Sequence, residues 1–151
     1  VGVLDFPLLR EQYVAVRGQG ALRGGKPLAA ARNEGPDDEH FLMKCTRTDR
    51  VYKLASPLKS RIMGSAAYHL CKIADGAALA GIEMSPKVWD LAAAWLILTE
   101  AGGVIVASDG DPIFPLAPER RDYKARSYTT FAAANAALLE HLRTAAILRA
   151  G

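Results

Sequence analysis

The chain has 151 residues, of which half are apolar and 23% are charged. This length and composition suit one globular domain with a hydrophobic core and exclude a disordered chain. The net charge of +3 is mild and the basic residues are scattered, so the basic stripe interleaved with aromatic residues that nucleic-acid binding requires is missing. No apolar run approaches the roughly 20 residues that cross a bilayer. Cys45 and Cys71 match no metal or disulfide spacing, and we interpret them as buried thiols of a cytoplasmic protein.

Residues 1–28 have an extended, turn-rich pattern. Residues 1–6 are mostly apolar, as in a strand covered on both faces, and Pro7 ends this run. Residues 12–16 predict a second strand and therefore a hairpin. The Gly24-Gly25 pair predicts a tight turn within a third extended piece.

Residues 29–40 form the most linker-like stretch, because turn formers and acids cluster there. The neighbouring acids Asp37, Asp38 and Glu39 could suggest a metal loop, but they lack the glycine-supported ligand spacing of a calcium site. The alternative, which we favour, is a solvated surface loop.

Residues 41–45 predict a short strand, and a short helix could begin near Arg47 and run toward Leu54. Ser65 is a good N-cap for a helix from residues 66 to 75 that Gly76 closes. The apolar residues of that helix repeat at helical spacing. His69 lies opposite them, and we interpret it as a surface histidine rather than a ligand.

Residues 77–84 predict the next strand, with Glu83 near its carboxyl end. A helix follows, with Ser85 as a suitable N-cap and Pro86 at the first helical position. Gly102-Gly103 closes this helix, which is apolar nearly all round and should therefore lie inside a layered domain.

Asp90 lies in the first turn of this helix. Its carboxylate could be stabilised only by backbone N–H groups and the helix dipole, or it could face a cleft and hold a metal ion. In α/β sheets the carboxyl ends of strands and the first turns of helices meet at one edge, where ligands bind. Glu83, Asp90 and the Gly64-Ser65 helix start can therefore face one crevice.

The rest of the chain predicts a buried strand at residues 104–107 and a last strand at residues 128–133. Asn135 should cap a final helix that extends through Ala150. Asp109 and Asp111 stand in ordinary turn dipeptides, and we assign them no chemistry.

Several of these motifs resemble the inositol monophosphatase family. Residues 89–103 begin with Trp-Asp-Leu-Ala-Ala, end with Glu-Ala-Gly-Gly and resemble the C-terminal signature of that family. Gly64-Ser65-Ala66-Ala67 resembles its Gly-Ser/Thr-Ala-Ala helix start. Glu83 stands seven residues before Asp90, as the family's substrate-contacting glutamate does. The N-terminal hairpin also resembles that of the family, including its recurrent Gly-x-Gly-Ala.

The resemblance implies an α/β fold, a layered sheet-and-helix domain like the C-terminal domain of the family. It implies three regions: a β-hairpin region at residues 1–28 that completes an N-terminal sheet, a linker-like loop at residues 29–40, and a C-terminal α/β domain at residues 41–151. The family's Glu-Glu pair and Asp-Pro-x-Asp-Gly-Thr loop do not occur in this sequence. We therefore expect the chain to be the C-terminal portion of a longer phosphatase, and to be inactive alone.

The resemblance also implies site residues and a cofactor. Asp90 would be a ligand of Mg²⁺, Glu83 would accept hydrogen bonds from substrate hydroxyls, and Gly64, Ser65 and Ala66 would line the substrate pocket. The expected whole protein is a Mg²⁺-dependent phosphomonoesterase that hydrolyses inositol monophosphate or a related sugar or polyol phosphate. It would be a cytoplasmic homodimer that includes the missing N-terminal domain and binds neither nucleic acid nor membrane.

Two kinds of alternative stay open. A sister activity is one: fructose-1,6-bisphosphatase, histidinol-phosphatase or 3′-phosphoadenosine nucleotidase. Lys87 bears on this choice because it could meet a second phosphate and so favour a bisphosphate, although we favour the interpretation that it faces solvent. A non-catalytic homologue or binding module of the same fold is the other alternative.

Overall fold

The computed structural model describes residues 1–119, 121–122 and 124–149 of the chain. Its helices are short except for one in the middle of the sequence. In chain order they are the 3-10 turn η1 (Pro7–Leu9), α1 (Thr48–Val51), α2 (Ala66–Ala74), α3 (Val88–Glu100) and α4 (Ala136–Ala145).

The strands of the described residues form three sheets. An antiparallel sheet with the order β1-β2-β3-β4 consists of β1 (Gly2–Phe6), β2 (Glu11–Ala15), β3 (Ala21–Arg23) and β4 (Lys26–Pro27). A mixed sheet with the order β7-β5-β8-β10-β9 consists of β7 (Lys59–Arg61), β5 (Phe41–Lys44), β8 (Ala80–Glu83), β10 (Thr130–Ala133) and β9 (Val104–Ala107). A two-stranded sheet pairs β11 (Ala146–Leu148) with β6 (Tyr52–Leu54).

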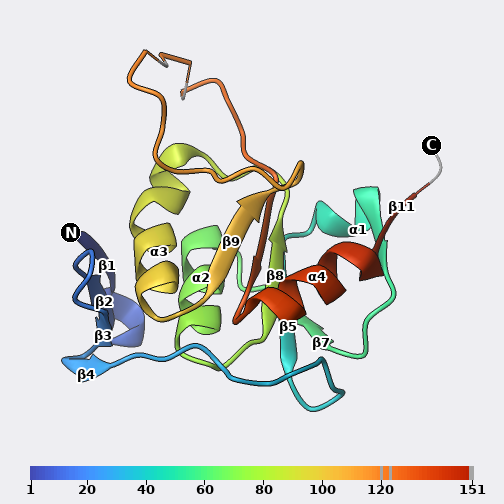
Figure 1. Cartoon of the computed structure of the whole chain (residues 1–151), viewed down its shortest axis with the longest axis horizontal. Helices are drawn as coiled ribbons and strands as arrows, with labels where there is room; N and C mark the ends of the chain where they lie inside the picture. Colours follow the sequence, from blue (N-terminus) through green and yellow to red (C-terminus); the bar gives the residue numbers. More distant parts are fainter. Residues whose placement is uncertain (120, 123, 150–151) are drawn as a thin grey trace.

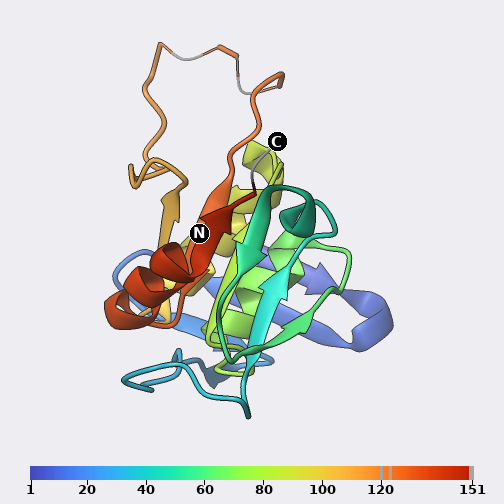
Figure 2. The same cartoon turned by 90° about the vertical axis from the view of Figure 1, so that its right-hand side faces the viewer.

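The elements stack in layers. Helices α2 and α3 pack side by side, with the N-terminal sheet against α3 on one side and the mixed sheet against α2 on the other (Figure 1). Helix α4 covers the opposite face of the mixed sheet, as the rotated view also shows (Figure 2). This arrangement confirms the predicted α/β class and the layered sheet-and-helix fold.

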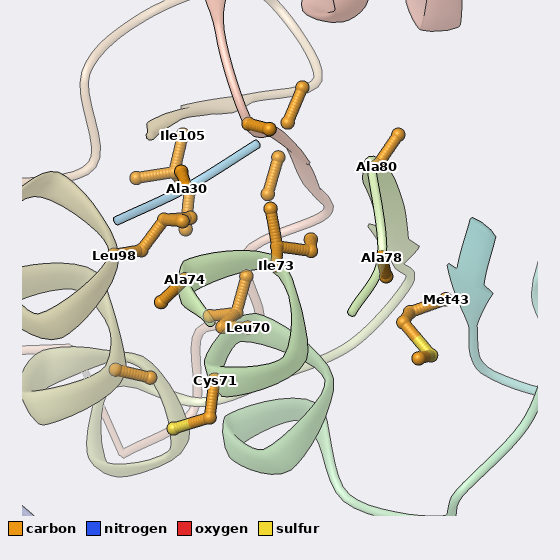
Figure 3. Close-up of a cluster of buried hydrophobic side chains, with 14 of the residues drawn as sticks. Ala30, Met43, Leu70, Cys71, Ile73, Ala74, Ala78, Ala80, Leu98 and Ile105 are labelled. Atoms are coloured by element: carbon orange, nitrogen blue, oxygen red, sulfur yellow. The ribbon is translucent and has the colours of Figure 1, made fainter. Parts of the chain in front are cut away.

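The core lies between the helix pair and the mixed sheet (Figure 3). Ile73 of α2 and Leu98 of α3 are fully buried there. Gly103 allows the chain after α3 to pass close to its neighbours, because a Cβ at this position would overlap the Leu98 side chain and lie 3.1 Å from the Ala133 carbonyl oxygen. The second glycine of the Gly-Gly motif therefore serves close packing between α3 and β10.

The N-terminal sheet has the predicted strands and the predicted turn. Gly24 and Gly25 have φ values of +54° and +80°, which suit the tight hairpin turns that glycine favours. The prediction that the first strand is covered on both faces is wrong. Along β1 the burial alternates, and Val3 is 51% exposed, because only one face of this sheet rests on α3.

Helix α3 differs from its prediction in two respects. It begins at Val88 with Lys87 as the N-cap, so Ser85 is not the N-cap and Pro86 lies outside the helix. The helix lies inside the layers, between the N-terminal sheet and α2, as predicted, but its burial is incomplete because Trp89 is 59% exposed. In the described part of the chain, neither sheet covers the side of the first turn of α3 on which Trp89 lies.

The C-terminal region is only partly as predicted. The Asn135 side chain accepts a hydrogen bond from Leu138 N–H at 3.0 Å, which confirms the N-cap. The helix ends at Ala145 rather than near Ala150, because the next residues form β11 and pair with β6. Ala150 itself lies outside the described residues.

Candidate functional site

A cavity of about 310 Å³ opens where the carboxyl end of β8 meets the first turns of α2 and α3. All five residues that the sequence analysis assigns to a site line this cavity, and five further residues complete its wall. The lining consists of Cys45, Thr46, Arg47, Gly64, Ser65, Ala66, Glu83, Ser85, Pro86 and Asp90. The structure therefore brings together residues that lie up to 45 positions apart in the sequence.

The first wall of the cavity is the start of α2. Gly64 has φ +81°, a left-handed backbone conformation that residues other than glycine rarely adopt. Ser65 is extended, and its Oγ accepts a hydrogen bond from Tyr68 N–H at 3.3 Å, which confirms the predicted N-cap. Gly64 and Ser65 thus turn the chain sharply and place Ala66 in the first turn of α2.

Asp90 forms the wall on the side of α3. Its Oδ2 accepts a hydrogen bond from the Lys87 backbone N–H at 2.8 Å, so this carboxylate supplies the N-terminal cap that Ser85 was expected to provide. Its position in the first turn also suits a negative charge, because the N-terminal end of a helix carries partial positive charge. The other carboxylate oxygen accepts no hydrogen bond from the described part of the chain.

Glu83 ends β8 and is 5% exposed. Its Oε1 is hydrogen-bonded to His69 Nδ1, and His69 Nε2 lies 2.8 Å from Met63 N–H. The interpretation of His69 as a surface histidine is wrong, because this residue is 1% exposed. The helical-face argument fails here because α2 is covered on several sides at once, by α3, β8, β5 and β10. The sequence feature that could have indicated a buried partner for His69 is the acid Glu83, at the end of the next long strand, β8.

Arg47 is the cation of the cavity wall and was not assigned to the site from the sequence. Its Nη1 donates a hydrogen bond to Ser85 Oγ, a neutral partner. Lys87, which could have met a second phosphate, does not line the cavity, because its Nζ donates to the Ala125 carbonyl oxygen at 2.8 Å. A cation therefore stands at the cavity, but on the loop after β5 rather than next to α3.

The donor set of the cavity suits a hard metal ion only in part. Carboxylate oxygens such as those of Asp90 and Glu83 are the ligands that Mg²⁺ prefers. However, among the described residues no three histidine, cysteine, aspartate or glutamate side chains gather closely enough to hold a metal ion. The ligand type fits Mg²⁺, and additional oxygen ligands are needed to complete its octahedral coordination.

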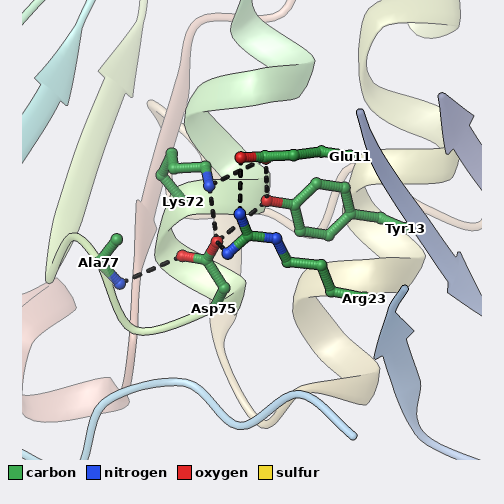
Figure 4. A network of polar contacts seen from close by, with 6 residues as sticks. All are labelled: Glu11, Tyr13, Arg23, Lys72, Asp75 and Ala77. Atoms are coloured by element: carbon green, nitrogen blue, oxygen red, sulfur yellow. Dashed lines mark hydrogen bonds and ion pairs between the residues drawn. The ribbon is translucent and has the colours of Figure 1, made fainter. Parts of the chain in front are cut away.

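A second polar cluster lies between the N-terminal sheet and α2 (Figure 4). Lys72 Nζ donates to Asp75 Oδ2 at 2.7 Å and to Glu11 Oε2 at 3.1 Å, and Arg23 binds the same two acids. The Tyr13 hydroxyl lies 2.8 Å from Glu11 Oε2 and 2.9 Å from Asp75 Oδ2. We name these five residues the clamp: Glu11, Tyr13, Arg23, Lys72 and Asp75.

The charges within the clamp balance, because two acids pair with two bases. Burial alone would raise the pKa of Glu11, but hydrogen bonds from Tyr13 and Lys72 hold it below its ordinary value. Burial alone would lower the pKa of Lys72, but the hydrogen bond and the charge of Asp75 raise it. A cavity of about 520 Å³ borders the clamp, yet the charged groups of the clamp already pair with one another. The clamp was not predicted from the sequence.

Glu100, in the Glu-Ala-Gly-Gly stretch, has a structural contact far from the cavity. Its two carboxylate oxygens accept hydrogen bonds from Gly18 N–H and Gly20 N–H, both at 2.9 Å. These backbone hydrogen bonds lower the pKa of Glu100. The contact ties the turn before β3 to the end of α3.

In the described ranges, no helix has the length and hydropathy needed to cross a membrane.

Comparisons with known proteins identify related chains. A model of the inositol monophosphatase family matches residues 1–147. Inositol monophosphatase 2 of Homo sapiens is 43% identical over an alignment of 124 residues, and the match covers 74% of this chain and 43% of that protein. Nus factor SuhB of Pasteurella multocida is 32% identical over an alignment of 120 residues, and the match covers 73% of this chain and 45% of that protein. The chain thus spans less than half the length of these relatives.

A solved structure, the inositol monophosphatase from Anabaena (Nostoc) sp. PCC 7120, superposes with a TM-score of 0.71. The match covers 95% of this chain and 56% of that chain, at 21% sequence identity. Because the identity is low, this match supports the fold alone. It agrees with the layers of helices and sheets described above.

Proposed function

Because this chain belongs to the inositol monophosphatase family, we propose that the whole protein is a Mg²⁺-dependent phosphomonoesterase whose substrate is inositol monophosphate or a related sugar or polyol phosphate. The observation that carries the proposal is the single cavity lined by Gly64, Ser65, Ala66, Glu83 and Asp90. These residues come from the start of α2, the end of β8 and the first turn of α3, and the sequence predicts a site role for each of them.

Each wall of the cavity has a proposed role. Asp90 would hold the metal with the carboxylate oxygen that accepts no hydrogen bond from the described chain, while its other oxygen keeps the start of α3 in place. Glu83 would accept hydrogen bonds from substrate hydroxyls, and residues 64–66 would form the wall against which the substrate rests. Bound Mg²⁺ would neutralise phosphate oxygens and lower the pKa of a bound water molecule.

Asp90 and Glu83 supply too few ligands for a catalytic metal pair. We propose that acids from a further segment of polypeptide, corresponding to an N-terminal domain, complete the site, and that the whole protein is a homodimer. The coverage of less than half of the curated relatives supports the first part of this proposal. Trp89, which is 59% exposed beside Asp90, offers an apolar surface that such a segment would cover.

Two alternatives differ from the main proposal in testable ways. A bisphosphate substrate is favoured by Arg47, because a guanidinium on the cavity wall suits a second phosphate. A binding module without catalysis is compatible with the described residues, which gather no three metal-ligating side chains. The first alternative predicts phosphatase activity with another ester, whereas the second predicts no activity with any ester.

The test is Mg²⁺-dependent phosphate release from inositol 1-phosphate, measured for this chain and for the protein extended upstream. We expect activity only in the extended protein. The Asp90→Asn variant should keep the Lys87 hydrogen bond yet lose at least about 100-fold in rate, more than the ~10–100-fold typical of residues that only orient a metal ligand.

The matched control is Asp109→Asn, which replaces an acid whose Oδ1 accepts a hydrogen bond from Asp111 N–H in a turn. This variant should retain the full rate. Equal losses in the two variants would contradict the role of Asp90. No activity of the extended protein with mono- or bisphosphates would favour the binding module.

A further inference from the structure

We propose that His69 is a positioning residue that fixes the orientation of Glu83 and joins it to the Gly64-Ser65 wall of the cavity. The hydrogen bonds on both nitrogens of the ring carry this inference. It rests on the proposed function for the role of Glu83 toward substrate, but the arrangement of His69 itself can be tested without any activity.

The two partners of His69 determine where its proton lies. The backbone N–H of Met63 can only donate, so His69 Nε2, at 2.8 Å, accepts. Because Nε2 accepts, it carries no hydrogen, so the hydrogen of the ring lies on Nδ1, which donates to Glu83 Oε1. The local hydrogen bonds thus specify one tautomer and one direction of hydrogen bonding.

This direction limits what Glu83 can recognise. As a carboxylate, Glu83 only accepts hydrogen bonds, and His69 occupies Oε1. The remaining acceptor capacity suits a donor, such as a substrate hydroxyl. A second phosphate or a carbonyl at this place would bring acceptor against acceptor. The pair of His69 and Glu83 therefore favours a polyhydroxylated substrate on this side of the cavity.

The position of His69 also makes its orientation rigid. Helix α2 lies near the centre of the molecule between α3 and the mixed sheet (Figure 1), and its residues from Tyr68 to Ala74 are buried. His69 is 1% exposed, so the ring has no solvent side toward which it could rotate. Because Met63 directly precedes Gly64, one imidazole connects the cavity wall to the carboxylate opposite it.

The first test is NMR of this chain with ¹⁵N-labelled histidine, because the nitrogen shifts of neutral imidazole distinguish its tautomers. We expect His69 to be neutral with its proton on Nδ1 and to exchange that proton slowly. His40 is the internal control, because it faces Asp37 on the surface with 36% of its side chain exposed. Its ring protons should exchange fast. A His69 proton on Nε2, or fast exchange from Nδ1, would overturn the proposal.

The second test uses the extended protein with two substrates that differ in hydroxyl groups. His69→Leu should lower kcat/KM for inositol 1-phosphate roughly 10- to 100-fold, mainly through KM, as loss of an orienting partner typically does. The effect on p-nitrophenyl phosphate, which has no hydroxyl for Glu83, should stay below about threefold because the metal site is intact. His69→Asn should restore most of the loss, since an asparagine amide can donate from the position of Nδ1.

The outcomes separate this inference from the proposed function. Equal losses on the two substrates, or no recovery in His69→Asn, would indicate a merely structural histidine and overturn the inference. If the unsubstituted protein hydrolyses neither substrate, the proposed phosphatase function fails, and the tautomer and proton exchange of His69 then decide its positioning role alone.

Discussion

Two groups of polar side chains in this chain differ in how completely they are paired. In the clamp, Lys72 contacts Glu11 and Asp75, Arg23 contacts the same acids, and the charges cancel. In the cavity, among the described residues, Glu83 has one donor, Asp90 has one backbone donor, and the cation Arg47 binds a neutral hydroxyl.

The difference indicates separate roles. A buried polar network whose members satisfy one another stabilises the arrangement of the elements that carry them. A buried carboxylate with unused acceptors costs stability and is kept where a ligand completes its partners. Substitutions in the clamp should therefore affect unfolding, whereas substitutions in the cavity should affect ligand binding and turnover.

Removing the central cation of the clamp should have the largest effect on stability. Lys72→Met leaves Glu11 and Asp75 with fewer partners in a site where the Lys72 side chain is only 11% exposed. We expect a loss of about 3 kcal/mol in the free energy of unfolding, measured by urea denaturation. The control Lys53→Met, at an exposed position of β6, should change it by less than about 0.5 kcal/mol. Equal effects would contradict the role of the clamp.

The free energy of unfolding should also depend on pH through the ion pairs of the clamp, with a smaller effect than that of Lys72→Met. The pKa of Glu11 is lowered in the folded chain, so its contribution is complete above the ordinary value of 4.5 and is lost as the pH falls through the folded value. The pKa of Lys72 is raised, so its contribution is complete below 10.5 and is lost as the pH rises through the folded value.

Unfolding free energies measured from about pH 3 to pH 11 should therefore fall at both ends. Lys72→Met should weaken both declines, because it removes the titrating cation and part of what lowers the pKa of Glu11. Burial also raises the pKa of Tyr13, so some alkaline decline should remain in the variant. Unchanged declines in Lys72→Met would contradict this explanation.

The smallest effect is expected at the cation of the cavity. Arg47→Ala removes an exposed side chain whose one described partner is Ser85 Oγ, so the stability of the chain should hardly change. In the extended protein, hydrolysis of a monophosphate should fall by less than about twofold. Hydrolysis of a bisphosphate should fall about tenfold, the factor that a charge-assisted hydrogen bond of ~1.5 kcal/mol supplies. A loss on the monophosphate alone would contradict the assignment.

Local signals explain what could be predicted from the sequence. The caps at Ser65 and Asn135 and the Gly24-Gly25 turn depend on a few adjacent residues, and all three occur in the structure. The convergence of Glu83, Asp90 and residues 64–66 was also predictable, because strand ends and helix starts meet at one edge of such a sheet.

Long-range contacts explain the features that could not be predicted from the sequence. Burial of His69 depends on elements that cover α2 from several sides, and the clamp joins Arg23 to Asp75 across 52 positions. Strand β11 forms because β6 offers it a partner, so no local signal ends the helix at Ala145. Ser85 has the chemistry of an N-cap, but Asp90 provides the hydrogen bond instead.

The most direct test of the difference between the clamp and the cavity is the free energy of unfolding of this chain with Glu11→Gln and with Glu83→Gln. We expect Glu11→Gln to destabilise the chain by about 1–3 kcal/mol, because a charged partner of Lys72 and Arg23 is lost. Glu83→Gln should be neutral or stabilising, because its amide oxygen still accepts from His69 and a buried charge is removed. A loss in Glu83→Gln as large as that in Glu11→Gln would show that Glu83 serves stability. It would contradict the proposed difference between the clamp and the cavity.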